Sequence, residues 1–137
     1  MKKEEIISYK TAKLAKEKGF NGFCMFYYEK STESLKPVFN GNYHIDEQDP
    51  DNLHFGFDMN IQSNSYYSAP TQSLLQKYLR EKHGIEVFID LDLNTEYFVV
   101  CKSLEKGLLF ESKDTYKTYE EALEKGLQEA LKLIKDE

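Results

Sequence analysis

The sequence has no tryptophan, two cysteines, three prolines and seven glycines among its 137 residues. So few cysteines exclude a disulfide-rich scaffold, and so few prolines and glycines exclude collagen-like and low-complexity chains. No apolar run approaches the roughly 18 residues that a membrane-spanning helix requires. No apolar signal region follows Lys2 and Lys3 either. We therefore expect a cytoplasmic protein that does not bind a membrane.

The chain also lacks an excess of positive charge. Eighteen basic residues against 24 acidic residues give a net charge of −6, so nucleic-acid binding would need a local basic patch. Aromatic residues make up 14% of the chain, as ten tyrosines and nine phenylalanines, which is too much for a disordered protein. We expect a single folded domain over residues 1–137, since this length supports a hydrophobic core without metal or disulfide bonds.

Three segments have the pattern of amphipathic helices. Their ranges are 9–18, 71–83 and 119–135. Ser8 is suited to cap the first helix, and Gly19 and Gly84 are placed to end the first and the second. Thr118 and Glu121 have the spacing of a capping box at the start of the third.

Apolar runs between these helices predict strands. Residues 23–28 are continuously apolar, and 53–61 alternate between apolar and polar positions. Alternation in 85–103 around a short turn predicts a β-hairpin, and shorter strands are expected near Val38 and at 108–111. Because strands and helices do not alternate regularly, the fold class is α+β. We expect a mostly antiparallel sheet of four to six strands that packs against the three helices.

The apolar stripes of the last two helices and the hairpin predict a common core. We expect burial of Leu75, Leu79, Val87, Ile89, Val99, Leu123, Leu127 and Leu131. Gly126 interrupts the apolar stripe of the third helix, which indicates a close backbone contact there. Cys24 and Cys101 are expected as buried free thiols, although a bridge would be possible between neighbouring strands.

Common catalytic motifs are absent from the sequence. There is no nucleophile elbow, no glycine-rich phosphate loop and no zinc-protease helix motif, and neither cysteine has a nearby histidine. No cofactor is expected, and the balance of the sequence is against an enzyme.

One set of residues has the composition of a metal site. His44, Asp46 and His54 could form a two-histidine, one-carboxylate set, and they support the alternative of a small metal-dependent enzyme or ligand-binding protein. The competing interpretation is that they are ordinary loop and strand-edge residues. The acidic run that starts at Asp49 fails as a calcium loop, because its sixth position is His54 where glycine is required.

The irregular region 40–67 is the expected place for a binding surface, since irregular segments held by a scaffold tend to carry contacts. Its candidate binding residues are Tyr43, His44, His54, Tyr66 and Tyr67. The alternative is that its aromatic rings fold back and complete the core against residues 23–28. Exposed aromatic side chains and open sheet edges favour a protein partner or self-association. Self-association would give a homodimer. The sequence gives no indication for or against a small-molecule ligand.

The order of elements over 70–134 is helix, strand, strand, short strand, helix, which is also the order in double-stranded RNA-binding domains. Such domains place lysines at the start of the last helix to hold phosphates. Here that position, 118–122, is acidic. Nucleic acid is therefore not an expected partner.

Three stretches carry a resemblance: 7–12, 69–83 and 118–134. They resemble small uncharacterised proteins of gut-bacterial phages and mobile elements. The resemblance implies a bacterial or phage source and a cytoplasmic setting, and it implies no activity. The leading prediction is a non-enzymatic binding or interaction module of this kind.

Overall fold

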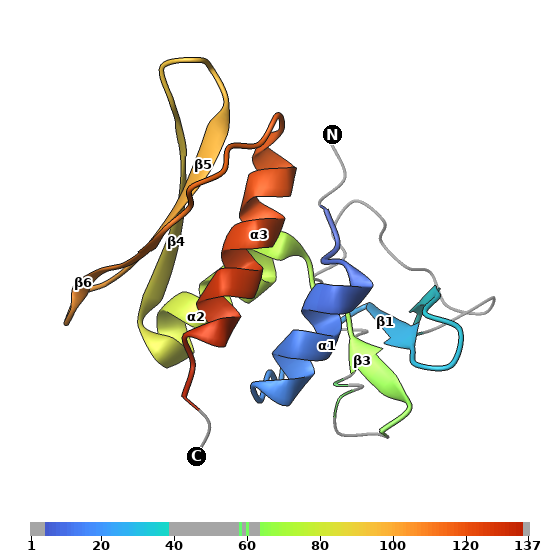
Figure 1. Ribbon diagram of the computed structural model, residues 1–137. Coiled ribbons are helices and arrows are strands. Elements are labelled where there is room, and N and C mark those ends of the chain that lie inside the picture. The colour runs from blue at the N-terminus through green and yellow to red at the C-terminus, as the bar shows by residue number, and fades with distance from the viewer. Residues whose placement is uncertain (1–4, 39–57, 59, 61–63, 136–137) are drawn as a thin grey trace. The chain divides into compact units, whose positions relative to one another are not determined.

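The computed structural model describes residues 5–38, 58, 60 and 64–135 (Figure 1). Its elements are α1 (Tyr9–Glu17), β1 (Phe26–Glu29), β2 (Leu35–Pro37), β3 (Tyr66–Ser68), α2 (Gln72–His83), β4 (Ile85–Leu91), β5 (Tyr97–Ser103), β6 (Gly107–Glu111) and α3 (Tyr119–Lys132). The expected α+β class and the three helices are confirmed. In the described residues the strands form two three-stranded antiparallel sheets rather than one.

The chain divides into two compact units, 1–74 and 75–137, each of which contains one of the sheets. We refer to them as unit 1 and unit 2. The boundary lies inside the first turn of α2. A single domain over 1–137 stays a prediction.

Unit 1 is built from α1 and the sheet β2-β1-β3. Tyr28 of β1 lies opposite Tyr67 of β3, so both side chains project from the same face of the sheet. The ring of Tyr9 in α1 meets both rings edge-on. Its centroid lies 5.7 Å from the centroid of the Tyr28 ring and 5.6 Å from that of the Tyr67 ring. The Tyr28 hydroxyl donates a 2.7 Å hydrogen bond to the Ile7 carbonyl. Aromatic packing of this kind therefore fixes α1 to one face of the sheet.

The ends of α1 follow the sequence prediction. The Ser8 hydroxyl accepts a 3.3 Å hydrogen bond from the Thr11 amide, and Gly19 has φ +89°, a conformation that favours glycine. The first strand begins at Phe26 rather than Phe23, whose side chain is exposed. The predicted strand 53–61 lies outside the described residues except for Asp58 and Asn60, which are not in a strand.

Unit 2 contains the predicted hairpin. β4 and β5 pair over seven residues each, and β6 pairs with β5 through a bulge between Cys101 and Lys102. Helix α3 packs on β4 and β5, and Figure 1 shows it along one face of the sheet with α2 on the same side. The side chain of Gln76 in α2 donates a 2.8 Å hydrogen bond to the Val87 carbonyl.

The core of unit 2 confirms most of the predicted set. Seven of the eight residues are buried, whereas Ile89 is half-buried, because it lies toward the end of β4, where the strand becomes exposed. The close contact at Gly126 is also present: a Cβ there would lie 2.7 Å from Val87 Cγ1 and 2.8 Å from Val99 Cγ1. The Thr118 hydroxyl accepts a 3.1 Å hydrogen bond from the Glu121 amide, as the capping pattern predicted.

Both cysteines are buried and free, Cys24 in unit 1 and Cys101 in unit 2. Burial raises the pKa of the Cys101 thiol to about 11, so this group is uncharged at neutral pH and unsuited to nucleophilic chemistry. Of the helices described, none combines the length and the apolar character needed to cross a bilayer.

Candidate functional site

The predicted binding residues are only partly within the described chain. Tyr43, His44, Asp46 and His54 lie outside the described residues. The described residues contain no cluster of three or more histidine, cysteine or acidic side chains that could hold a metal ion.

Tyr66 and Tyr67 follow one another on β3 and therefore project from opposite faces of the sheet. Tyr67 is 6% exposed and packs on Tyr9, so it belongs to the core, as the alternative interpretation of this region expected. Tyr66 is half-buried on the face turned away from α1. Of the two, Tyr66 is the one placed to contact a ligand.

The sheet face of unit 1 that carries Tyr66 is polar and aromatic, and we call it the tyrosine face. Its members are Tyr27, Glu29, Lys36, Tyr66 and the buried Ser68, because Tyr27 lies opposite both Lys36 and Ser68 and Glu29 lies opposite Tyr66. The Tyr27 and Tyr66 rings meet edge-on with their centroids 5.0 Å apart. Lys36 Nζ lies 2.9 Å from Glu29 Oε2. Two aromatic rings and one ion pair thus share a single surface.

The charges of this face offset each other. The hydrogen bond from Lys36, helped by a 3.1 Å hydrogen bond from the Thr32 hydroxyl, lowers the pKa of Glu29. The same bond raises the pKa of Lys36. Both groups therefore stay ionised around neutral pH, and the pair has no net charge.

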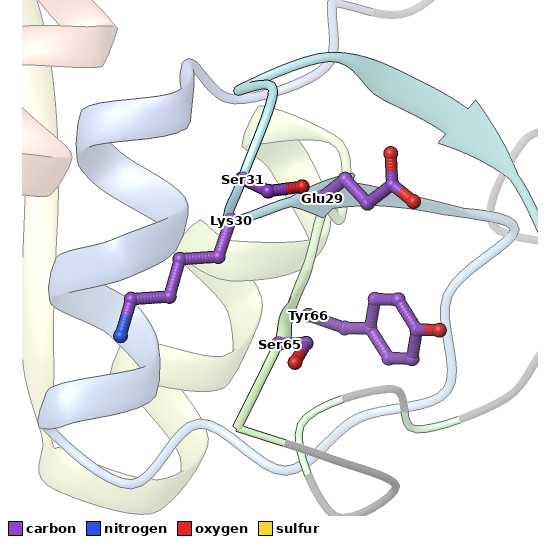
Figure 2. A pocket seen from close by; sticks show the side chains of 5 residues that line it. All are labelled: Glu29, Lys30, Ser31, Ser65 and Tyr66. Carbon is purple, nitrogen blue, oxygen red and sulfur yellow. The ribbon is translucent and has the colours of Figure 1, made fainter.

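A pocket of about 580 Å³ lies at the end of this face (Figure 2). Its lining residues are Glu29, Lys30, Ser31, Ser65 and Tyr66. Figure 2 shows the side chains of Glu29 and Tyr66 pointing to one side and that of Lys30 pointing to the other. The Lys30 amide donates a 2.9 Å hydrogen bond to the Ser65 carbonyl, which joins the two walls.

A lysine from α1 holds the far wall of this pocket. Lys16 Nζ donates a 2.9 Å hydrogen bond to the Tyr66 carbonyl and lies 5.5 Å from the centroid of the Tyr67 ring. Burial, and next the nearby charge of Lys30, lower the pKa of Lys16. Lys16 therefore positions the backbone at Tyr66 rather than offering a solvated charge.

The second candidate surface is the face of the unit 2 sheet opposite α3, which we call the phenylalanine face. Its apolar members are Phe88, Phe98, Val100 and Leu108, and its charged members are Glu86, Asp90, Lys102 and Glu111. Phe88 is 46% exposed and Leu108 is 59% exposed. Phe98 and Val100 are half-buried between them. An apolar centre is thus left uncovered on this side of the sheet.

Three carboxylates and one ammonium surround that centre. Glu86 is offset by Arg80, with 3.6 Å between Arg80 Nε and Glu86 Oε1, and Lys102 Nζ lies 5.7 Å from the centroid of the Phe88 ring. In the described part of the chain, Asp90 and Glu111 form no ion pair. The rim of the phenylalanine face is therefore acidic.

The sequence predicted Tyr66 as a binding residue, but it did not indicate the other residues of the two surfaces. The alternation of 85–103 predicts the two faces of the hairpin, but not which face the helix covers. The pocket joins β1 to β3 across nearly forty positions, and no local pattern indicates that pairing.

Comparison with known proteins gives no relative from which a role could be transferred. No protein-family model, no curated protein sequence and no solved structure matches the chain significantly. The two surfaces therefore have to be interpreted from their own chemistry.

Proposed function

We propose that the protein is a non-enzymatic interaction module that binds another protein through the phenylalanine face. The observation that carries this proposal is the exposure of Phe88 and Leu108 beside Val100 on a face that neither α2 nor α3 covers. Uncovered apolar patches with a charged rim are typical of protein contact sites. The resemblance of 7–12, 69–83 and 118–134 to small uncharacterised proteins of gut-bacterial phages and mobile elements is the basis for proposing a bacterial or phage source and a cytoplasmic setting.

The size of the face indicates the kind of partner. Seven-residue strands at about 3.4 Å per residue, and three strands about 4.8 Å apart, give a surface of about 24 Å by about 14 Å. An α-helix about 10 Å wide fits this surface. Helix α3, with 14 residues, already packs on the opposite face of the same sheet. A partner of this size buries less than a standard interface, so the affinity is on the order of micromolar or weaker.

The charge of the face indicates the partner's chemistry. Asp90 and Glu111 leave the rim acidic, and the whole chain carries a net charge of −6. Charge complementarity therefore favours an amphipathic helix with apolar anchors and lysine or arginine at its flanks. A second copy of this chain would bring the same acidic rim against itself.

Fluorescence anisotropy with two labelled peptides tests this function. One is an amphipathic helix of leucine and lysine, and its matched control has glutamate in place of every lysine. We expect the full-length protein to bind the lysine peptide and not the glutamate peptide. Phe88→Ser should weaken binding by about tenfold or more, equivalent to about 1.4 kcal/mol.

Leu104→Ser is the matched control variant, because Leu104 is fully exposed in the β5–β6 turn and lies off the face. It should bind the lysine peptide as the unaltered protein does. Equal binding of both peptides, or binding that Phe88→Ser leaves unchanged, contradicts the proposal. A dimer in sedimentation that Phe88→Ser dissociates would make a second copy the occupant and would also overturn it.

A further inference from the structure

We propose that the pocket of unit 1 is a binding site for a neutral, hydroxyl-rich ligand, that is, a saccharide. This inference is independent of the interaction module proposed above, since it concerns another sheet and another chemistry. It is carried by the tyrosine face and by the five residues that line the pocket beside it.

The ring of Tyr66 supplies the apolar part of such a site. It lines the pocket and is supported edge-on by Tyr27 at 5.0 Å, while Lys16 holds the Tyr66 carbonyl from behind. A sugar presents one face of C–H groups that packs on an aromatic ring, and a supported ring contributes apolar contact at little entropic cost.

The remaining lining groups supply hydrogen-bonding partners. A sugar hydroxyl both donates and accepts, so it matches a surface that contains both kinds of group. The Glu29 carboxylate accepts, and the hydroxyls of Ser31, Ser65 and Tyr66 can do either. The lining of the pocket therefore offers both hydrogen-bond donors and hydrogen-bond acceptors.

The charge balance favours a neutral ligand over an ion. Glu29 lies in the lining and is paired with Lys36 at 2.9 Å, so an anion would meet a carboxylate and a cation would meet a carboxylate whose charge is already offset. Lys30 points away from Glu29 and Tyr66 (Figure 2). The pocket of about 580 Å³ is open to solvent, and its volume has room for one or two sugar rings.

A titration followed by amide chemical shifts tests the inference on the full-length, ¹⁵N-labelled protein. The probes are the methyl glycosides of glucose, galactose, mannose and N-acetylglucosamine, each added to millimolar concentration, with inorganic phosphate as a separate arm. We expect at least one glycoside to shift the amide signals of Ser31, Ser65 and Tyr66 in a saturable way, and phosphate to leave them in place.

Two variants distinguish the loss of ligand binding by a blocked pocket from the loss of binding by unfolding. Ser31 is exposed in a turn, so Ser31→Trp should block the pocket without unfolding the chain and should abolish the glycoside-induced shifts. Leu104→Trp adds the same ring to an exposed turn of unit 2 and should leave the shifts unchanged. The inference is overturned by the absence of saturable shifts with every glycoside, by shifts with phosphate alone, or by shifts that persist in Ser31→Trp.

Discussion

The two units use the same architecture and expose different chemistry. Each has a three-stranded antiparallel sheet with a helix on one face, α1 in unit 1 and α3 in unit 2. The other face carries tyrosines and a neutralised ion pair in unit 1, but in unit 2 it carries phenylalanines and, among the described residues, two carboxylates without an ion pair, Asp90 and Glu111. Along each strand, alternate side chains point away from the helix. These side chains, rather than the topology of the sheet, therefore determine which chemistry each unit offers to a ligand.

The cores of the two units also differ, since one is packed with aromatic side chains and the other with aliphatic side chains. In unit 1 the helix is held by edge-on tyrosine rings and by the hydroxyl of Tyr28. In unit 2 it is held by aliphatic side chains and by the close approach of Gly126 to β4 and β5. Truncation of an apolar side chain should therefore affect unit 2 most, and loss of a hydroxyl should affect unit 1 most.

The largest expected effect is that of Leu127→Ala in α3. Leu127 is fully buried, so the lost apolar burial and the resulting cavity should lower the free energy of unfolding by about 2–5 kcal/mol. Urea denaturation followed by circular dichroism measures this change. Leu133→Ala, at the exposed end of the same helix, is the control. A loss below about 0.5 kcal/mol for Leu127→Ala would show that α3 does not depend on this packing.

The corresponding change in unit 1 is Tyr28→Phe. It removes the donor to the Ile7 carbonyl and leaves a buried acceptor without that partner, which should destabilise the protein by about 1–3 kcal/mol. Tyr27→Phe removes a hydroxyl from the half-buried opposite face and should cost less than about 0.5 kcal/mol. Equal effects of the two substitutions in thermal unfolding would contradict the role assigned to the Tyr28 hydroxyl.

Gly126→Ala tests the close approach of α3 to its sheet. The added methyl group would clash with Val87 and Val99, and overpacking of this kind typically costs about 1–3 kcal/mol. The better helix propensity of alanine offsets up to about 1 kcal/mol of that loss. We expect a net destabilisation that Val87→Ala, combined with Gly126→Ala, partly relieves in a double-mutant cycle. Stabilisation by Gly126→Ala alone would rule the clash out.

The helix caps give the smallest expected effects. Thr118→Ala should destabilise the protein by about 1 kcal/mol, because it removes the 3.1 Å hydrogen bond to the Glu121 amide. Ser8→Ala removes a 3.3 Å hydrogen bond from the Thr11 amide and also the 3.0 Å hydrogen bond between the Ser8 and Thr11 hydroxyls, so it should destabilise the protein at least as much. Parallel urea titrations of the two variants compare the caps, and a clearly smaller effect of Ser8→Ala would show that the bond between the Ser8 and Thr11 hydroxyls contributes little.

Local patterns explain which parts of this structure the sequence could predict. Helix α3 and the β4–β5 hairpin follow from apolar spacing and from the capping residues Thr118 and Glu121, all of which act over a few positions. The division into two sheets did not follow, because the pairing of β1 with β3 joins distant segments. Tyr66 was predicted as a binding residue, but its pocket partners Glu29 and Ser31 were not, because no local pattern around them indicates a pocket.

The tyrosine face of unit 1, with its pocket, and the phenylalanine face of unit 2 are proposed to bind different ligands, and one ¹⁵N-labelled sample tests this directly. The sample is titrated first with the glycoside that binds best and then with the leucine–lysine peptide, and amide shifts are followed throughout. We predict that the glycoside shifts Ser31, Ser65 and Tyr66, and that the peptide then shifts Phe88, Val100 and Leu108 without reversing the first set. Displacement of one ligand by the other, or the same amides responding to both, would contradict the account.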